Sequence, residues 1–238
     1  MIDLYASVSP NVVKVVIALE EMSLPYVMHD VQLMKSENFS PDFLKLSPTA
    51  KVPVIVDRDP AAGGPYTVFE SGAILLYLAD KTGKFLPKDV IARHDAIQWL
   101  MMQMANIGPL FGQYVHFSRY APQDKVAYAR DRFRTNVRNL LDVIEMRLGD
   151  VPYVGGADYT IADMAVLPWM QVIDFILGDG ASADYPTIQA WAQGLASRPA
   201  IARAVRVVSE LRDRLTPFDQ GQPEVHDRLF GRGAYSRY

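Results

Sequence analysis

The chain has 238 residues, half of them apolar, which suits one large domain or two small ones with a real core. The formal net charge of -3 argues against nucleic acid or an anionic membrane as the main partner. The absence of cysteine excludes disulfides, thiolate metal sites and a protein thiol nucleophile. The four histidines show no helical pairing, so we expect no metal site. No apolar run reaches the roughly 18 residues that span a bilayer, and the first residues do not resemble a signal peptide, so we expect a cytoplasmic protein.

The N-terminal part, residues 1–83, alternates strand and helix signals. A strand is expected over residues 2–6. Ser9 followed by Pro10 is a strong start signal for a helix, because serine is a good N-cap and proline is tolerated at the first helical position. The β-branched residues that follow favour a strand instead. We predict a helix, since the start signal is strong and the sequence Ala-Leu-Glu-Glu-Met continues the run.

Further along, a second strand is expected over residues 26–33 and an irregular helical segment over 38–46. Residues 51–80 then read as strand, hairpin, strand and helix. The first crossover needs parallel strands joined in the right-handed sense, whereas the hairpin needs antiparallel strands. This mixed order is typical of a thioredoxin-like domain.

The stretch that begins at Lys51 has the features of a peptide-binding site. Pro53 cannot donate to a sheet, so it suits the first residue of a strand, and the backbone of Val52 is then able to pair with an extended peptide. Ser71 is a suitable cap for the next helix, whose N-terminus favours a carboxylate. The alternative is a plain strand start and a plain helix cap.

Helix signals dominate the second half. Residues 84–90 are the expected linker, residues 91–216 an all-helical domain and residues 217–238 a tail that is either loose or docked on a neighbouring subunit. A long helix is expected to kink at Gly108-Pro109. Thr160 and Asp163 form a capping-box pattern, to which we assign a folding role.

The motif Lys51-Val52-Pro53 followed by Glu70-Ser71 resembles the glutathione-binding signature of the glutathione transferases. An α/β domain followed by an all-helical domain is also that family's architecture. The resemblance implies that Pro53 is cis, that Val52 pairs with the cysteinyl backbone of glutathione, and that Glu70 and Ser71 hold the γ-glutamyl group.

Ser9-Pro10-Asn11 resembles the Thr-Pro-Asn motif of the bacterial nu class, which is related to the yeast prion-type nitrogen regulators. The serine preserves the hydroxyl of the usual threonine. The resemblance implies that Asn11 and Ser9 stabilise the glutathione thiolate, and that one site binds two glutathiones or glutathione disulfide and reduces small disulfides. It also implies a homodimer.

Two more site residues follow from this resemblance, and two others from the apolar face of a helix in the second half. Asn38 stands where a glutamine is expected, and Arg132 is the best match for an arginine that binds the glutathione carboxylates; its alternative is a solvated charge on a helix. Phe111 and Tyr114 would face the substrate, although such residues are more often helix core. Two other functions stay open: conjugation or thioether or ether cleavage on an aromatic electrophile, and a regulatory module without catalysis.

Overall fold

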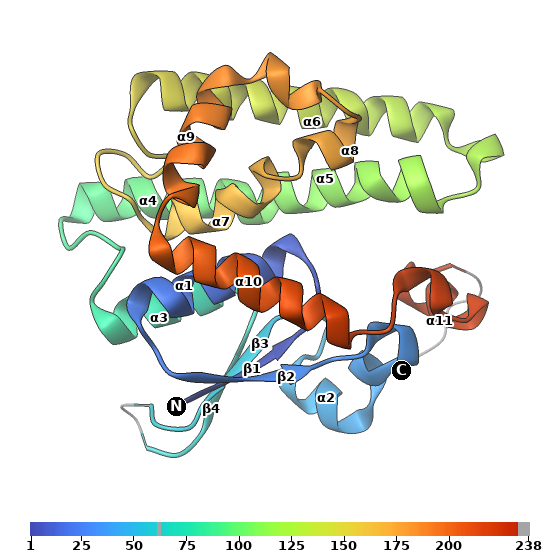
Figure 1. Cartoon of the computed structure of the whole chain (residues 1–238), viewed down its shortest axis with the longest axis horizontal. Helices are drawn as coiled ribbons and strands as arrows, with labels where there is room; N and C mark the ends of the chain where they lie inside the picture. The colour runs from blue at the N-terminus through green and yellow to red at the C-terminus, as the bar shows by residue number, and fades with distance from the viewer. Residues whose placement is uncertain (61–62, 233–238) are drawn as a thin grey trace. The chain divides into compact units, whose positions relative to one another are not determined.

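The structure is a computed structural model that describes residues 1–60 and 63–232 (Figure 1). It divides into two compact units, which are residues 1–77 with the chain from 203 onward, and residues 78–202. The sequence analysis set the first boundary at residue 83 and assigned residues 91–216, which include α10 (Pro199–Arg214), to the helical domain. In the structure, most of that helix belongs to the first unit.

The first unit is built on a mixed four-stranded sheet. Its strands are β1 (Ile2–Ala6), β2 (Tyr26–Asp30), β3 (Val54–Asp57) and β4 (Tyr66–Phe69), in the order β2-β1-β3-β4. β1 pairs in parallel with β2 and antiparallel with β3, and β3 pairs antiparallel with β4. The thioredoxin-like arrangement is therefore confirmed. β1 is buried along almost its whole length, as expected of a central strand covered on both faces.

Three helices accompany this sheet, namely α1 (Pro10–Met22), α2 (Pro41–Leu46) and α3 (Ser71–Thr82). α1 begins as the sequence predicts, with Ser9 as cap and Pro10 in the first turn. Its β-branched residues do not prevent the helix, because residues 15–19 are fully buried and their packing outweighs intrinsic propensity.

The second strand is shorter than predicted. It ends at Asp30 rather than at residue 33, and two single 3-10 turns follow, Leu33–Lys35 and Glu37–Phe39. Gln32, directly before the first turn, has φ of -79° and ψ of 85°, which lies outside the extended region that a strand needs. Ser36 joins the two turns with φ of 60°. The irregular helical segment expected over residues 38–46 corresponds to the end of the second turn followed by α2.

The C-terminal elements complete the chain. They are α10 (Pro199–Arg214), the 3-10 turn Phe218–Gln220 and α11 (Pro223–Leu229). Arg203 on α10 binds Glu20 on α1 through Nε at 2.7 Å, so α10 is tied to the sheet-containing unit. α11 packs against the turn Leu33–Lys35.

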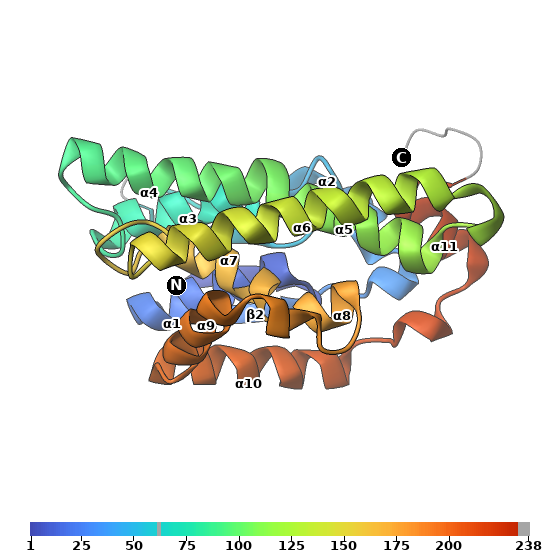
Figure 2. The ribbon, with the colours of Figure 1, turned by 90° about the horizontal axis from the view of Figure 1, so that it is seen from above.

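The second unit is helical. Its main helices are α4 (Val90–Met102), α5 (Gly108–Val115), α6 (Ala127–Asp150), α7 (Ile161–Met170), α8 (Ile173–Leu177) and α9 (Pro186–Ala196). Shorter turns are Gln103–Ile107, His116–Tyr120, Gln123–Lys125 and Ala181–Asp184. α5 and α6 lie side by side, as Figures 1 and 2 both show, and α9 packs on α6.

The long helix is irregular just before Gly108-Pro109, where the π-helical turn Gln103–Ile107 joins α4 to α5. A wider turn accommodates a proline that cannot donate its backbone hydrogen bond.

The capping box is confirmed: Asp163 accepts hydrogen bonds from the backbone of Thr160 at 3.0 Å and of Val154 at 2.7 Å. Burial raises the pKa of Asp163 to about 6, against the effect of these donors.

Candidate functional site

The N-terminus of α1 is the first part of the candidate site. Ser9 is extended, and its Oγ accepts a hydrogen bond from the backbone of Val12 at 3.2 Å. Ser9 and Asn11 are both half-buried, so a ligand can reach them. The first turn, Pro10–Val13, contains no acidic residue, and the outward N–H groups of a 13-residue helix create positive potential there. A thiolate is the kind of charge that this end stabilises.

The loop before β3 forms the second part. The peptide bond between Val52 and Pro53 is cis, which confirms the backbone expectation. Lys51, which precedes Val52, is held by the hydroxyl of Ser47. The Lys51 backbone N–H donates to Ser47 Oγ at 3.1 Å, and this hydroxyl donates to the Lys51 carbonyl at 2.8 Å. Lys51 is exposed and Val52 half-buried. The loop therefore presents a fixed backbone edge beside the sheet.

Asn38 supports that loop through a hydrogen bond. Its side chain is buried, and Nδ2 donates to the Ala50 carbonyl at 3.0 Å. Ala50 has φ of 55°, so this hydrogen bond secures an uncommon backbone conformation directly before Lys51. Among the described residues, Asn38 Oδ1 has no hydrogen-bond partner. In the structure, Asn38 positions the backbone at Ala50. Its direct contact with glutathione stays a prediction.

The start of α3 is the third part. Glu70 has φ of 66° and is exposed, whereas Ser71 is buried at the first position of the helix. Three consecutive residues, Glu70, Ser71 and Gly72, thus turn the chain sharply from β4 into α3. This turn presents a carboxylate next to a set of helix N–H groups, which suits a ligand that carries both an ammonium and a carboxylate.

Lys14 is a site neighbour that the sequence analysis missed. It lies on α1 one turn after Asn11, and its side chain is fully buried. Burial lowers its pKa to about 7, while the Glu70 carboxylate favours its charged form. The sequence signal that could have pointed to Lys14 is a single lysine inside the apolar run 12–19, because lysine is rarely found on a buried helix face.

The remaining predicted residues belong to the second unit. Phe111 is fully buried and meets Trp169 edge to face, with 6.0 Å between the ring centroids. Tyr114 is also buried, and Arg132 is exposed on α6. Packing inside the helical unit accounts for Phe111. Contacts of Phe111, Tyr114 and Arg132 with a ligand stay predictions.

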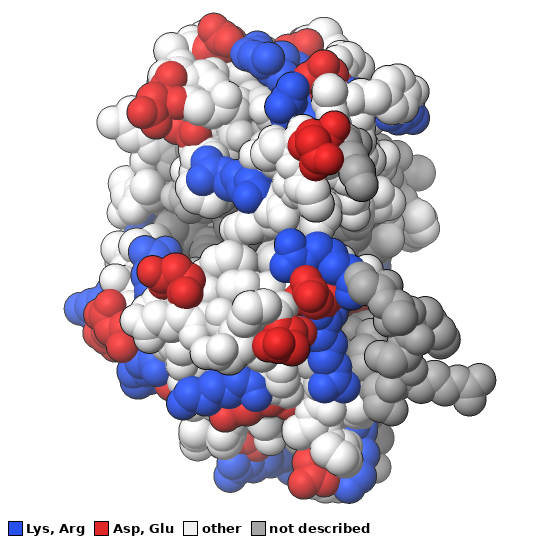
Figure 3. Space-filling view, turned by 90° about the vertical axis from the view of Figure 1, so that its right-hand side faces the viewer, with Lys and Arg blue, Asp and Glu red and all other residues white. Residues whose placement is uncertain are grey.

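Within residues 1–60 and 63–232, no three acidic or histidine side chains are grouped so that they could hold a metal ion. In the same ranges, no helix has the length and apolar character to cross a bilayer. On the face drawn in Figure 3, positive and negative side chains are interspersed.

Comparison with known proteins gives consistent matches along the chain. Residues 8–81 match the family model of the glutathione S-transferase N-terminal domain, and residues 107–199 match that of the C-terminal domain. The disulfide-bond oxidoreductase YfcG of Escherichia coli is 43% identical over 211 residues, which cover 86% of this chain and 94% of the relative. The disulfide-bond oxidoreductase YghU of Escherichia coli is 36% identical over 239 residues, covering 95% and 80%.

Solved structures agree with these relatives. A glutathione transferase family member from Pseudomonas fluorescens, with two glutathione bound, is 39% identical with a TM-score of 0.81, covering 86% of this chain and 92% of the other. A glutathione transferase from Pseudomonas putida, with one glutathione disulfide bound per subunit, is 36% identical with a TM-score of 0.81, covering 87% and 91%.

Proposed function

Since the chain belongs to the glutathione S-transferase family, we propose that it is a nu-like enzyme that uses glutathione to reduce small disulfides. The observation that carries the proposal is the N-terminus of α1, where Ser9 and Asn11 flank the start of a helix without an acidic residue in its first turn. Two relatives are named disulfide-bond oxidoreductases, and solved relatives hold two glutathiones or one glutathione disulfide.

The chemistry follows from the ligand's sulfur, because this chain has no cysteine. A free thiol has a pKa near 8.5 and is only a few per cent ionised at pH 7. Each unit by which the pKa falls needs about 1.4 kcal/mol of preferential interaction with the anion. The helix N-terminus, the Asn11 amide and the Ser9 hydroxyl supply such interactions. None of these groups is a base, so the thiol proton passes to solvent.

Disulfide reduction suits a site of this kind because the leaving group is also a thiolate. The bound glutathione thiolate attacks one sulfur of the disulfide R–S–S–R, which forms a glutathione mixed disulfide and releases RS⁻. A second glutathione thiolate attacks the glutathionyl sulfur of that mixed disulfide, which yields glutathione disulfide and a second RS⁻. Both released thiolates take a proton from water, and no electron donor other than glutathione is needed.

The other site residues are proposed to bind rather than to activate glutathione. Lys51 and Val52 would hold its backbone, with Pro53 fixing the loop, and Glu70 and Ser71 its γ-glutamyl end. Beyond these, Asn38 and Arg132 are the proposed contacts to the rest of the molecule, with Phe111 and Tyr114 on the substrate side. We further propose a cytoplasmic homodimer; sedimentation at low concentration would show a species near 26.6 kDa if the dimer were wrong.

One purified sample tests the function. Glutathione-dependent reduction of hydroxyethyl disulfide is measured beside conjugation of a chloronitrobenzene. We expect rapid disulfide reduction and little conjugation. The opposite result would move the assignment to a transferase or lyase with an aromatic substrate, and glutathione binding without turnover of either compound would favour a regulatory module.

A further inference from the structure

The hydroxyl of Ser47 holds the chain directly before the cis peptide bond. Ser47 is 1% exposed and follows the last residue of α2. Its Oγ accepts a hydrogen bond from the Lys51 backbone N–H at 3.1 Å and donates to the Lys51 carbonyl at 2.8 Å. The Ala50 N–H donates to the Ser47 carbonyl at 3.0 Å, which closes the loop over residues 47–51. One buried serine therefore fixes both backbone polar groups of Lys51.

This hydroxyl is not needed for the end of α2. The helix ends through the backbone of Ser47, whose N–H donates to the Phe43 carbonyl at 2.9 Å. Burying a hydroxyl costs free energy unless it forms hydrogen bonds. Within residues 1–60 and 63–232, both hydrogen bonds of Ser47 Oγ are with Lys51. The side chain thus acts on the loop rather than on the helix.

The loop needs such support because its backbone is irregular. Ala50 is buried and has φ of 55°, a left-handed conformation that is uncommon for alanine. Asn38 Nδ2 donates to the Ala50 carbonyl at 3.0 Å, on the residue next to the one that Ser47 holds. Side-chain hydrogen bonds to two consecutive residues thus take the place of the backbone pairing that a strand or a helix would provide. They keep the backbone in one conformation up to Val52.

The held backbone lies at the end of the sheet where the candidate site is built. β3 begins at Val54, which is paired with Tyr5 near the end of β1 and with Phe69 at the end of β4. From these two strands the chain passes into α1 and, through Glu70, into α3. Val52 comes just before β3, so its backbone is at the same end of the sheet as both helix starts. A peptide that spans the two helix starts would pass along this edge.

In the proposed function, the Val52 backbone pairs with the cysteinyl unit of glutathione, and the present inference rests on that function. We propose that Ser47 is a positioning residue for this contact, because it holds Lys51 so that the Val52 backbone is in place before the peptide binds. An edge that is fixed in advance loses little conformational freedom on binding, which favours affinity. The hydrogen bonds of Ser47 are with Lys51 rather than with Ser9 or Asn11. Ser47 should therefore affect the binding of glutathione and not the reactivity of its thiolate.

Kinetics of three variants test this role. Ser47→Ala removes both hydrogen bonds, so we expect the KM for glutathione in disulfide reduction to rise about fivefold, with kcat within about twofold of the wild type. Ser47→Thr keeps the hydroxyl, and the extended backbone at this position (φ of -130°, ψ of 98°) suits a β-branched side chain, so the KM should stay close to that of the wild type. Ser40→Ala is the matched control with an unchanged KM. It removes a hydroxyl at the start of α2, which accepts from the Phe43 backbone at 3.3 Å.

Calorimetry with two ligands separates positioning from a general loss of stability. The ligands are S-methylglutathione and its analogue methylated at the cysteinyl nitrogen, which cannot donate a hydrogen bond to the Val52 carbonyl. We expect the wild type to bind S-methylglutathione about tenfold more tightly than the analogue. In Ser47→Ala this ratio should fall several-fold, whereas Ser40→Ala should keep it. A protein that is only less stable would bind both ligands less well and keep the ratio of the wild type.

The outcomes distinguish the role of Ser47 from the proposed function. A ratio in Ser47→Ala equal to that of the wild type would overturn the positioning role, and disulfide reduction by the wild type would leave the function intact. Equal affinities of the wild type for the two ligands would also overturn it, because the contact with Val52 would then be missing. A wild type that binds S-methylglutathione but reduces no disulfide would overturn the reductase, and the ratio would still decide the role of Ser47. A wild type that binds neither ligand would overturn both proposals.

A second substitution keeps the test decisive if Ser47→Ala does not fold. Ser47→Cys keeps the size of the side chain and weakens both hydrogen bonds, because a thiol is a weak donor and a weak acceptor. The same calorimetry under reducing conditions should give a ratio between those of the wild type and of a protein without the contact. A ratio equal to that of the wild type would overturn the positioning role.

Discussion

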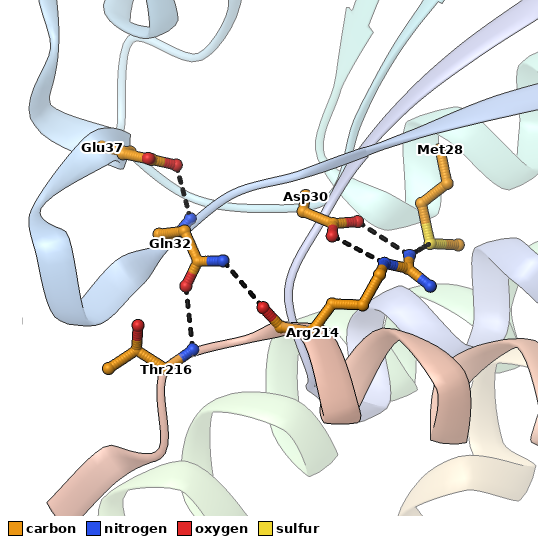
Figure 4. A network of polar contacts seen from close by, with 6 residues as sticks. All are labelled: Met28, Asp30, Gln32, Glu37, Arg214 and Thr216. Atoms are coloured by element: carbon orange, nitrogen blue, oxygen red, sulfur yellow. Dashed lines mark hydrogen bonds and ion pairs between the residues drawn. The ribbon is translucent and has the colours of Figure 1, made fainter. Parts of the chain in front are cut away.

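Arg214 donates a forked pair of hydrogen bonds to Asp30, through Nε at 2.7 Å and Nη2 at 2.8 Å (Figure 4). The two residues are 184 positions apart, at the end of α10 and the end of β2. Next to them, Gln32 pairs with the main chain at Arg214 and Thr216. The end of β2 thus anchors the point at which residues 215–231 leave α10.

Replacing Arg214 with methionine should loosen this anchor. A partly exposed pair of good geometry contributes roughly 0.5–1 kcal/mol, so the global stability should fall only slightly. The local effect should be larger, because the pair fixes the start of the segment 215–231. We expect faster hydrogen exchange at the amides of residues 215–230. Arg212→Met, two residues away, is the control, and equal exchange in the two variants would contradict the anchor.

The same pair predicts a dependence on pH. The hydrogen bonds of Arg214 hold the pKa of Asp30 below its ordinary value. A carboxyl whose pKa is lowered on folding stabilises the folded state above its unfolded pKa, and loses this contribution as the pH falls through the folded pKa. Wild type should therefore lose more stability than Arg214→Met between pH 5 and pH 2. Urea unfolding across that range measures the difference, and parallel losses would contradict it.

The sequence predicts the parts of the fold that depend on local signals. The helix at Pro10, the cis bond at Pro53 and the capping box at Asp163 each follow from a few adjacent residues or from the family motif that contains them. The end of β2 does not, because the chain leaves the extended region at Gln32, and glutamine is not a residue type that signals a turn.

Contacts between distant parts of the chain are the other gap. The tail was expected to be loose or to dock on a neighbouring subunit, whereas residues 215–231 pack on the first unit of the same chain. Partners such as Gln32 and Thr216 carry no pattern that links them in sequence. A cavity lined by Val8 and Phe218, among others, arises from this packing, so local sequence patterns do not reveal it.

Asn11 is predicted to affect turnover more than binding. Asn11→Ala removes an amide that can donate to the thiolate, and we expect turnover to fall by one to two orders of magnitude, roughly 1.4–3 kcal/mol. The thiolate absorbance of bound glutathione should shift to higher pH in this variant. Unchanged turnover, with glutathione still bound, would remove Asn11 from the proposed mechanism.

Ser71 is predicted to affect binding more than turnover. Ser71→Ala should raise the KM for glutathione several-fold with little change in kcat, because the hydroxyl would contact the γ-glutamyl end rather than the sulfur. Ser40→Ala removes another serine at a helix start, where Oγ accepts from the Phe43 backbone, and serves as the control. If Ser71→Ala loses stability to the same extent as Ser40→Ala and keeps its KM, the residue acts only in the fold.

Lys14 gives a prediction on stability, because it is buried with a pKa lowered to about 7. In the unfolded chain its pKa is near 10.4, so between these values the unfolded state binds more protons than the folded state. Stability of the wild type should therefore rise with pH, by about 2 kcal/mol from pH 7 to pH 9 through this group alone. Lys14→Met should be as stable as the wild type or more so at pH 7, since an apolar side chain of similar length replaces a buried amine and Glu70 stays exposed.

Urea unfolding of both proteins at pH 7 and pH 9 isolates the contribution of Lys14, because all other groups titrate in both. The wild type should gain relative to Lys14→Met as the pH rises. Equal changes in the two proteins would show that Lys14 keeps its proton up to pH 9. In that case the attraction of the Glu70 carboxylate would outweigh the effect of burial on the pKa of Lys14. A wild type that loses stability relative to the variant would contradict the sign of the pKa shift itself.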